Sequence, residues 1–332
     1  MPKPRKAQIS LDATPYYHCI SRCVRRAFLC GEDAFTGKSF EHRREWIRDK
    51  LFELAEIFSI DLTGYVIMSN HLHVLLYIDQ KCAKQWKSHE VVERWHRLFS
   101  GSLLSQRFAA GEKLSRAERQ SLGEQIDCWR MRLMSISWFM RCLNEPIARQ
   151  ANKEDECTGR FWEGRYKSHA LLDDEALIAC LAYIDPNPIR AGMAQKPEDS
   201  DYTSIQDRIQ QLKSSSNASN SQSDQPKHLS PFVGNDREKM PKGLAFDLKE
   251  YLQLVDWTGR AILENKRGFI PNDCPPILQR LEIDKQQWLH MTQHFESKFK
   301  GLVGTVNSLK KACKKLGYRR TPNLTACRQL LT

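Results

Sequence analysis

Residues Gly64-Tyr-Val-Ile-Met-Ser-Asn-His-Leu-His-Val-Leu-Leu76 decide the fold of this chain, because they read as two strands joined by a tight turn at Ser69-Asn70. The pattern predicts strands over residues 61–68 and 71–78. Side chains two positions apart in a strand share one face, so the imidazoles of His71 and His73 project together, about 7 Å apart along the backbone. Two such side chains can converge on one metal ion. The alternative is a purely structural histidine pair.

The residues before this hairpin predict a strand and a helix. Residues 15–23 alternate as a strand does, with His18, Ile20 and Arg22 on one face. Between Phe40 and Phe58 apolar residues recur at spacings near 3.6, which indicates an amphipathic helix. A strand and a helix followed by a β-hairpin favour an α+β sheet with helices packed on it.

The remainder of the chain is expected to be mostly helical. A helical insertion covers about residues 81–125, a helix runs from about 127 to 148, and a strand-turn-strand covers 159–172. A further helix begins at Asp173 and ends near Pro186. Residues 1–212 would form one domain, a flexible linker rich in serine would follow over residues 213–229, and residues 230–332 would form a mainly helical C-terminal unit of unassigned role.

The charge balance favours a polyanionic partner. Lysine and arginine number 51 against 40 aspartates and glutamates, a net charge of +11, and each phosphate that such residues neutralise releases a counterion. A solvated basic surface is the alternative. No apolar run is long enough to span a membrane, and no secretory h-region follows the basic start.

The cysteines predict reduced thiols rather than disulfides. There are 11 of them, an odd number, without any Cys-x-x-Cys pair, which is typical of a cytosolic protein. Zinc binding by Cys19, Cys23 and Cys30 is an alternative, although their spacing matches no common zinc site.

Tyr183 and Asn187 are the candidates for the second half of an active site. They stand four residues apart, so on a continuous helix they would share a face. A phenol close to a metal can attack a phosphodiester, and the resulting link is readily reversed. A half-buried aromatic at a helix end is the structural alternative for Tyr183. Pro186 lies between the two residues and interrupts the helix, which puts the position of Asn187 in question.

A stretch of basic and aromatic residues predicts contacts with a single nucleic-acid strand. Aromatic rings stack on bases while cations meet phosphates; the residues concerned are Arg160, Trp162, Arg165, Tyr166 and Lys167. An ordinary hairpin with alternating faces is the alternative. Tyr166 is also the rival nucleophile. The basic cluster from Lys310 to Arg320 is either an auxiliary grip on DNA or a solvated helix face.

Three motifs in this order resemble the single-tyrosine HUH transposases, and within them the REP-associated tyrosine transposases. They are the hairpin quoted above, Gly159-Arg-Phe-Trp-Glu-Gly-Arg-Tyr-Lys-Ser168, and Tyr183-Ile-Asp-Pro-Asn-Pro-Ile-Arg-Ala-Gly192. Residues 17–22 and Arg25-Arg26-Ala27-Phe28 also look like the family's first strand. The resemblance covers roughly residues 13–200, apart from the insertion.

The resemblance implies a ferredoxin-like HUH palm, in which an antiparallel sheet carries the histidines and helices pack on one side. It implies that His71, His73 and Asn187 bind Mg²⁺ or Mn²⁺, and that Tyr183 is the nucleophile and becomes joined to the 5′ phosphate of single-stranded DNA beside a hairpin or palindromic repeat. Arg22 and Arg190 would join the nucleic-acid-binding residues.

This interpretation predicts a cytoplasmic, nucleoid-associated enzyme of DNA transposition, with a homodimer as one way to bring two tyrosines together. The alternatives are a domesticated DNA-binding protein without catalysis, and a host nuclease acting on repeats or on RNA.

Overall fold

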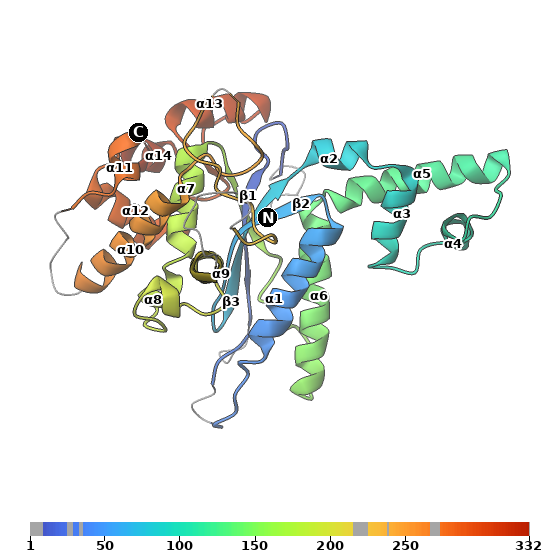
Figure 1. Cartoon of the computed structure of the whole chain (residues 1–332), viewed down its shortest axis with the longest axis horizontal. Coiled ribbons are helices and arrows are strands. Elements are labelled where there is room, and N and C mark those ends of the chain that lie inside the picture. Colours follow the sequence, from blue (N-terminus) through green and yellow to red (C-terminus); the bar gives the residue numbers. More distant parts are fainter. Residues whose placement is uncertain are drawn as a thin grey trace.

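The computed structural model describes residues 9–24, 29–32, 36–214, 225–237, 239–265 and 273–331. The protein is an α+β protein built around one five-stranded sheet with the strand order β2-β3-β1-β4-β5 (Figure 1). The strands are β1 (Tyr16–Arg22), β2 (Ile60–Ile67), β3 (His71–Ile78), β4 (Lys167–Leu171) and β5 (Leu302–Val303). Residues 25–28, which entered the family resemblance, lie outside the described residues.

The first four strands have the ferredoxin-like arrangement that the family resemblance implies. β1 lies between β3 and β4 and is antiparallel to both, while β2 pairs with β3. The helix α1 (Arg43–Ile57) connects β1 to β2, and α6 (Ile136–Glu154) precedes β4. The expectation of a fully antiparallel sheet is wrong in one respect: β5 pairs with β4 in parallel, so the sheet is mixed.

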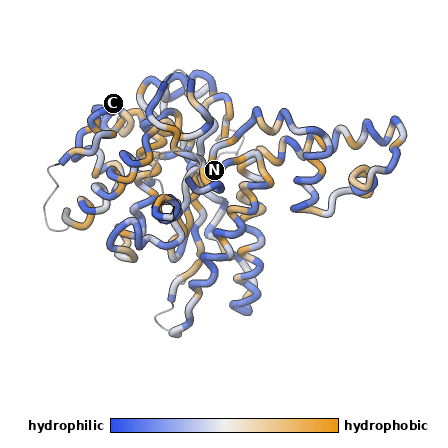
Figure 2. The backbone as a smooth tube through the Cα atoms, viewed as in Figure 1, coloured by the Kyte–Doolittle hydropathy of each residue, from blue (hydrophilic) through white to orange (hydrophobic). Residues whose placement is uncertain are grey.

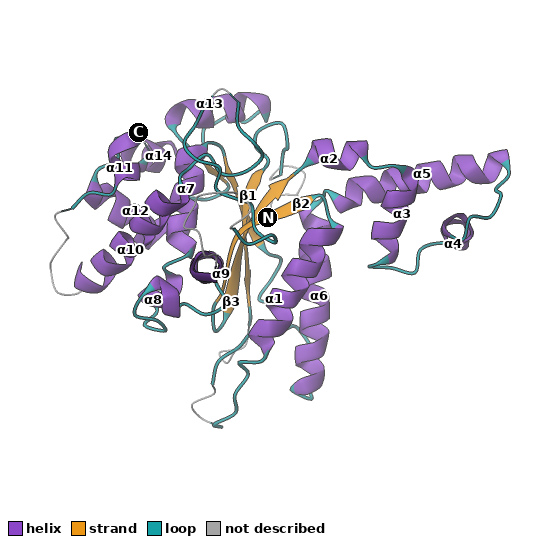
Figure 3. Ribbon diagram, viewed as in Figure 1, coloured by secondary structure: helices purple, strands orange, loops and turns teal. Residues whose placement is uncertain are grey.

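Helices cover both faces of the sheet, rather than one face as expected. α1 and α6 pack against each other on one face, and Asn144 of α6 donates a hydrogen bond to Ser21 of β1 there. On the other face lie α7 (Asp174–Ile184) and α12 (Lys285–Lys298), with α10 (Leu248–Asn265) beside α7 (Figure 3). Every residue from Ala176 to Ile184 is buried, because α7 is enclosed on all sides.

The insertion after β3 is helical and forms an arm that projects from the sheet (Figure 1). It consists of α2 (Gln80–Gln85), α3 (Ser88–His96), α4 (Leu103–Ala109) and α5 (Arg116–Leu133). Trp95 stacks on Trp129 with ring centroids 5.2 Å apart and holds α3 against α5. The arm therefore extends beyond the expected end near residue 125.

Two expectations on either side of α6 are wrong. The single helix over residues 127–148 is two helices, since α5 ends at Leu133, whose carbonyl accepts a hydrogen bond from the backbone N–H of Ser59, and α6 starts at Ile136. Pro146 lies inside α6 rather than near its end. Of the strand-turn-strand over residues 159–172 only β4 forms; Trp162 makes a single bridge to Cys23.

The described C-terminal residues contribute to the sheet and to the hydrophobic core. β5 extends the sheet, α12 packs on α7, and the buried Trp257 and Trp288 belong to the same hydrophobic core as the sheet residues. The other elements are α8 (Asn187–Arg190), the 3-10 helix η2 (Pro197–Asp199), α9 (Ser204–Ser214), α11 (Pro276–Arg280), α13 (Val306–Lys315) and α14 (Leu324–Leu330).

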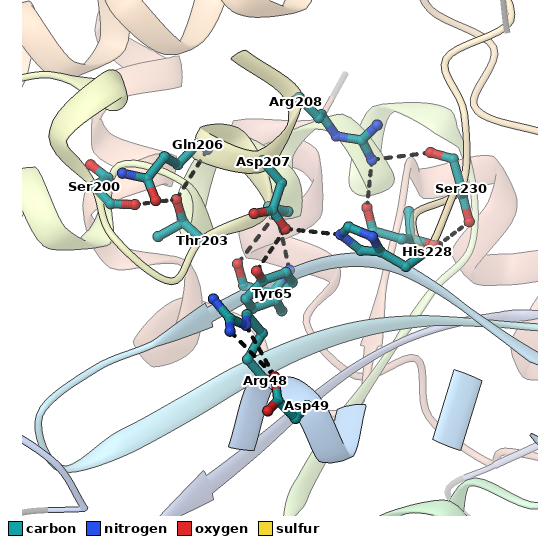
Figure 4. A network of polar contacts seen from close by, with 12 residues as sticks. Arg48, Asp49, Tyr65, Ser200, Thr203, Gln206, Asp207, Arg208, His228 and Ser230 are labelled. Atoms are coloured by element: carbon teal, nitrogen blue, oxygen red, sulfur yellow. Dashed lines mark hydrogen bonds and ion pairs between the residues drawn. The ribbon is translucent and has the colours of Figure 1, made fainter. Parts of the chain in front are cut away.

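The last part of the expected linker is packed against the sheet. The ring of His228 packs at a tilt of 32° on that of Phe52 of α1, with centroids 3.8 Å apart. His228 also bonds to Asp207 of α9, and Asp207 accepts a hydrogen bond from Tyr65 of β2 (Figure 4). Arg208 donates to the carbonyls of Thr63 and Ser230. Residues 225–229 are therefore fixed on the fold, whereas residues 215–224 lie outside the described part.

Hydrophobic residues gather in the sheet and in α7, at the centre of the molecule (Figure 2). Among the described helices, none combines the length and the apolar character needed to cross a bilayer.

Candidate active site

The strand register places four histidines on one face of the sheet. On β1 and its neighbours, His18 lies opposite His169, and Ile20 lies opposite His73. Residues directly opposite in an antiparallel pair project from the same face. His71 follows on the same face, two residues before His73, with ring centroids 4.8 Å apart. The expected pairing of His71 with His73 on one face is therefore present.

Three of these imidazoles form a hydrogen-bonded chain. Nε2 of His18 lies 2.9 Å from Nδ1 of His73, and Nδ1 of His18 lies 3.4 Å from Nδ1 of His169. All three side chains are buried. Burial lowers the pKa of each ring, to about 4 for His169, and the neighbouring histidines lower the pKa of His18 and of His73 further. The three rings are accordingly neutral at neutral pH.

His71 stands at the more open end of this row. Its Nδ1 lies 2.5 Å from Oδ1 of Asn70, which leaves Nε2 for another partner. Burial lowers its pKa to about 4, and the charge of Arg22 acts in the same direction. A neutral imidazole whose Nδ1 is held by an oxygen is the form in which histidine binds a metal through Nε2.

Tyr183 of α7 contacts two of these histidines, because α7 packs on the face of the sheet that carries them. Its ring centroid lies 5.6 Å from that of His73 and 6.2 Å from that of His18, edge to face in both cases. Burial raises the pKa of its phenol to about 12, while the charge of Arg190 opposes this rise. The guanidinium carbon of Arg190 lies 4.8 Å from the ring centroid, and its Nη2 donates to the Tyr183 carbonyl at 2.7 Å.

The two imidazoles of β3 fit part of a metal-binding site. Nε2 of His73 is buried and has no hydrogen-bond partner among the described residues, as expected for a ring nitrogen kept for a cation. Among these residues, however, no group of three His, Cys, Asp or Glu side chains is placed to hold an ion. A complete shell would need further donors, such as an amide, water or phosphate oxygens.

Asn187 does not continue the helix that carries Tyr183. α7 ends at Ile184, and Asn187 begins the separate turn α8 after Pro186, which lacks the N–H that would extend α7. Its side chain is buried, and its Nδ2 has no hydrogen-bond partner among the described residues. The four-residue spacing therefore does not put Asn187 and Tyr183 on one continuous helical face.

Helix α12 closes the site, a feature that the sequence did not predict. Phe295 stacks on Tyr183, and Glu296 pairs with Lys167 at 2.7 Å and with Arg22 at 3.9 Å. Burial alone would raise the pKa of Glu296, but the hydrogen bond and the charge of Lys167, together with the charge of Arg22, outweigh burial and the pKa is lowered. The one signal in the sequence is that Glu296 is the single acid in the otherwise basic stretch from Phe295 to Arg320.

A cavity of about 530 Å³ opens beside Tyr183. Its lining is polar and comes from β1, β4, α7 and α12, with Arg22, Glu163, Lys167, Tyr183, Gln293, His294, Glu296 and Ser297. A larger cavity of about 1020 Å³ lies along β2 and contains none of the four histidines. The smaller cavity is therefore the one that reaches Tyr183, although the four sheet histidines do not line it.

The structure separates the residues expected to bind nucleic acid. Arg22 and Lys167 lie at the cavity, and Arg160 and Arg165 are exposed. Tyr166 is buried, and its hydroxyl lies 3.1 Å from that of Ser137 in α6, on the face of the sheet away from the histidines. It is therefore placed neither to stack on a base nor to act as the rival nucleophile.

Trp162 and Arg190 also differ from the expected surface residues. The half-buried Trp162 donates its indole N–H to the carbonyl of Asn144, and Arg190 packs against Tyr183. Both side chains are therefore held by other protein groups.

The three N-terminal cysteines do not form a metal site. Cys19, Cys23 and Cys30 are buried, and Cys30 donates its thiol to the carbonyl of Met68. Burial raises the pKa of Cys30 to about 12, so the thiol stays protonated. They are structural side chains.

Neither a known family model nor a curated protein matches this chain. Among solved structures, it is similar to one described as a REP-associated tyrosine transposase bound to a REP hairpin, with 11% sequence identity and a TM-score of 0.38. That match covers 69% of this chain and 100% of the other chain. The function proposed below therefore rests on the geometry of the site.

Proposed function

We propose that this protein is a metal-dependent nuclease and strand transferase that cuts single-stranded DNA with Tyr183 as its nucleophile, in the manner of a transposase. The observation that supports the proposal is the contact of the Tyr183 ring of α7 with His73 of β3, whose ring in turn contacts that of His71, beside a cavity bordered by Arg22 and Lys167.

In the proposed step the phenol of Tyr183 loses its proton and its oxygen attacks the phosphorus of a phosphodiester. The new O–P bond forms as the P–O3′ bond breaks, and the leaving 3′ oxygen takes up a proton. The DNA 5′ phosphate is then joined to Tyr183, and attack by a free 3′ hydroxyl reverses the step without another energy source. Arg190 assists by stabilising the phenolate, because its cation lies over the ring.

The proposed cofactor is Mg²⁺ or Mn²⁺, held by Nε2 of His71 and of His73. Such an ion polarises the phosphate and offsets the charge that develops on it. Asn187 is the proposed further ligand, since its buried amide nitrogen bonds to no described group and can turn without losing a hydrogen bond there.

The proposed substrate is single-stranded DNA next to a hairpin. Arg22 and Lys167 border the cavity at Tyr183 and would hold the phosphates on either side of the cut. Arg160 lies before the bridge at Trp162 and Arg165 lies between that bridge and β4; both are exposed and would extend this basic path. The phosphates of a bound strand must compete with the carboxylate of Glu296 for Arg22 and Lys167.

The test is covalent capture of DNA by the full-length protein. The substrate is a set of single-stranded hairpins with randomised flanks, labelled at the 3′ end because that fragment stays on the tyrosine, incubated with Mn²⁺. A labelled band at the size of the protein on a denaturing gel is the expected result. Its loss in Tyr183→Phe, and its persistence in the matched variant Tyr166→Phe, would assign the nucleophile.

Two further samples distinguish the alternatives. RNA hairpins of the same sequence show whether the protein distinguishes ribose from deoxyribose in its substrate. A host nuclease acting on RNA would form the adduct with these RNA hairpins or would cleave them. If the wild type binds the DNA hairpins but never forms an adduct in Mn²⁺ or Mg²⁺, the nuclease proposal is wrong and a DNA-binding protein without catalysis remains.

A further inference from the structure

Two buried histidines that the proposed chemistry does not use directly, His18 and His169, are tied to His73 through its Nδ1. We infer that they are positioning residues: they fix the tautomer of His73 with its proton on Nδ1, so that Nε2 presents a lone pair toward the tyrosine side of the site. The inference rests on the proposed function for its purpose, but the tautomer itself follows from the hydrogen bonds between the three rings together with the surroundings of His73.

The neutral state of the rings limits the hydrogen bonds that each of them can form. The side chains of His18 and His73 are fully buried, and among the described residues their hydrogen-bond partners are other imidazoles, so a charge on either ring would lie in the interior without an opposite charge. A neutral imidazole carries one N–H donor and one acceptor. Both nitrogens of His18 are engaged, one by His73 and one by His169. The two hydrogen bonds must therefore point in the same direction along the chain.

Only two protonation patterns satisfy this condition. In the first, His73 donates from Nδ1 to His18, and His18 donates from its own Nδ1 to His169, which carries its proton on Nε2. In the second, every bond is reversed, and His73 carries its proton on Nε2.

The surroundings of His73 select the first pattern. Its Nε2 is buried without a hydrogen-bond partner in the described part of the chain, whereas Nε2 of His169 is not among the buried nitrogens that lack one. The second pattern would leave an N–H unpaired in the interior, and buried donors without a partner are rarer than buried acceptors without one. The first pattern leaves only a lone pair there, which is what a cation needs.

The same geometry accounts for the orientation of the His73 ring. The rings of His18 and His73 are stacked with centroids 5.1 Å apart and planes 16° apart, and the ring of Tyr183 approaches His73 edge to face. With Nδ1 held by His18 and the ring packed on both sides, Nε2 is the one nitrogen of His73 that is left for a ligand. His18 thus acts on the site through His73 and has no direct role in the reaction.

The first experiment reads the tautomer without a metal. Full-length protein with ¹³C-labelled and ¹⁵N-labelled histidine is studied by NMR in EDTA at pH 7.5, and His73→Gln identifies the signals of His73. The expected result is a protonated Nδ1 and an unprotonated Nε2 on His73. A proton on Nε2 would overturn the inference, because the chain would then run in the opposite direction.

The second experiment compares variants of His18 by their affinity for Mn²⁺ alone, measured by electron paramagnetic resonance. In His18→Gln the amide oxygen can accept from His73 while the amide N–H₂ donates to His169, so affinity is expected within about threefold of the wild type. His18→Leu fills the space but accepts nothing, and affinity should fall about 10–100-fold. Equal affinity in His18→Leu and the wild type would overturn the inference.

His71→Ala separates this inference from the proposed function. In one outcome His73 has its proton on Nδ1, but the wild type binds Mn²⁺ no better than His71→Ala does. The tautomer assignment is then correct, and the part of the proposed function that assigns a metal to His71 and His73 is wrong. If the wild type binds Mn²⁺ through His71 while His18→Leu binds it equally well, the proposed site stands and the positioning role is wrong. The NMR measurement needs no variant of His18, so it decides the tautomer even where His18→Leu does not fold.

Discussion

The ring of Phe295 lies flat against the ring of Tyr183, with centroids 5.3 Å apart and planes 22° apart. Phe295 belongs to α12, more than 100 residues after the tyrosine, so the nucleophile is enclosed by a part of the chain outside the family resemblance. This contact helps to bury the phenol, and burial is the largest cause of its raised pKa. The acidity of Tyr183 is therefore partly set by α12.

Replacing Phe295 by leucine should lower the pKa of Tyr183 from about 12 toward its ordinary value near 10, because one face of the phenol becomes more accessible to water. NMR of ¹³C-tyrosine-labelled protein between pH 8 and 11, with Tyr183→Phe to identify the signal, measures this directly. The matched control is Phe232→Leu, which removes a similarly stacked ring from Tyr251, with centroids 4.8 Å apart. A Tyr183 signal that titrates identically in the wild type and in Phe295→Leu would contradict the prediction.

Replacing Arg190 by glutamine should have the opposite effect on the same phenol. The guanidinium favours the phenolate, so its loss raises the pKa of Tyr183 and reduces the phenolate fraction at any pH below that value. With a cation–π contribution of about 0.5–2 kcal/mol, adduct formation at pH 8 should slow by roughly 2-fold to 30-fold.

The measurement for Arg190→Gln is the pH dependence of single-turnover adduct formation. The rate should rise with pH in the wild type, and the rise should be displaced to higher pH in the variant. Arg149→Gln, which removes an exposed cation from α6, should leave the profile in place. An unchanged profile in Arg190→Gln would mean that the cation does not act on the nucleophile.

The sequence predicted the elements of the site better than their assembly. The period of two in residues 71–78 predicts that His71 and His73 share a face, and the structure confirms it because the strand is regular. The same period puts His18 on a face with Arg22. It does not reveal which residue of a distant strand lies opposite, and so the chain of His18, His73 and His169 became visible only through the register.

The failures have two physical causes. Local propensity cannot see tertiary hydrogen bonds, and the end of α5 at Leu133, whose carbonyl is bonded by Ser59, is an example. Contacts between distant segments leave almost no local pattern, as with Phe295 and Glu296 of α12. The prediction that the aromatic residues between positions 160 and 167 stack on bases fails for a related reason. Composition alone does not show that Trp162 and Tyr166 are hydrogen-bonded to other protein groups.

Replacing Glu296 by glutamine should strengthen binding of single-stranded DNA. The carboxylate now pairs with Lys167 and lies near Arg22, and without its charge both cations are available to phosphates. Affinity at moderate salt should rise on the order of fivefold, about 1 kcal/mol. The dependence of log K on log salt should steepen by about 0.7 for each phosphate gained.

Fluorescence anisotropy with a labelled hairpin at several salt concentrations, in EDTA, gives both quantities. Glu53→Gln is the matched control, because Glu53 also accepts from a lysine at 2.7 Å but lies on α1, away from the cavity. Equal affinity and an equal salt slope in Glu296→Gln and the wild type would show that phosphates do not use these two cations.

The buried histidines should make the metal-free protein sensitive to mild acid. Their folded pKa values lie below the ordinary value of 6.5, so as pH falls below 6.5 the unfolded chain gains protons that the folded chain does not. Stability is therefore present above pH 6.5 and is lost as pH falls toward 4. For His169 alone, a pKa of about 4 corresponds to a loss of about 3 kcal/mol over this range.

One buried acid works in the other direction, and the net effect can still be predicted. Burial raises the pKa of Asp185 to about 6, so its carboxyl makes the fold more stable as pH falls from 6 toward 4. This offsets one histidine but not all of the buried rings. Urea unfolding in EDTA at pH 7, 5.5 and 4.5 should show a steady fall in the free energy of unfolding. His169→Gln should reduce the slope of the free energy of unfolding against pH by about one proton, or about 1.4 kcal/mol per pH unit. The control His290→Gln, at an exposed position, should leave that slope unchanged. Equal slopes in both variants would mean that His169 is protonated in the folded protein.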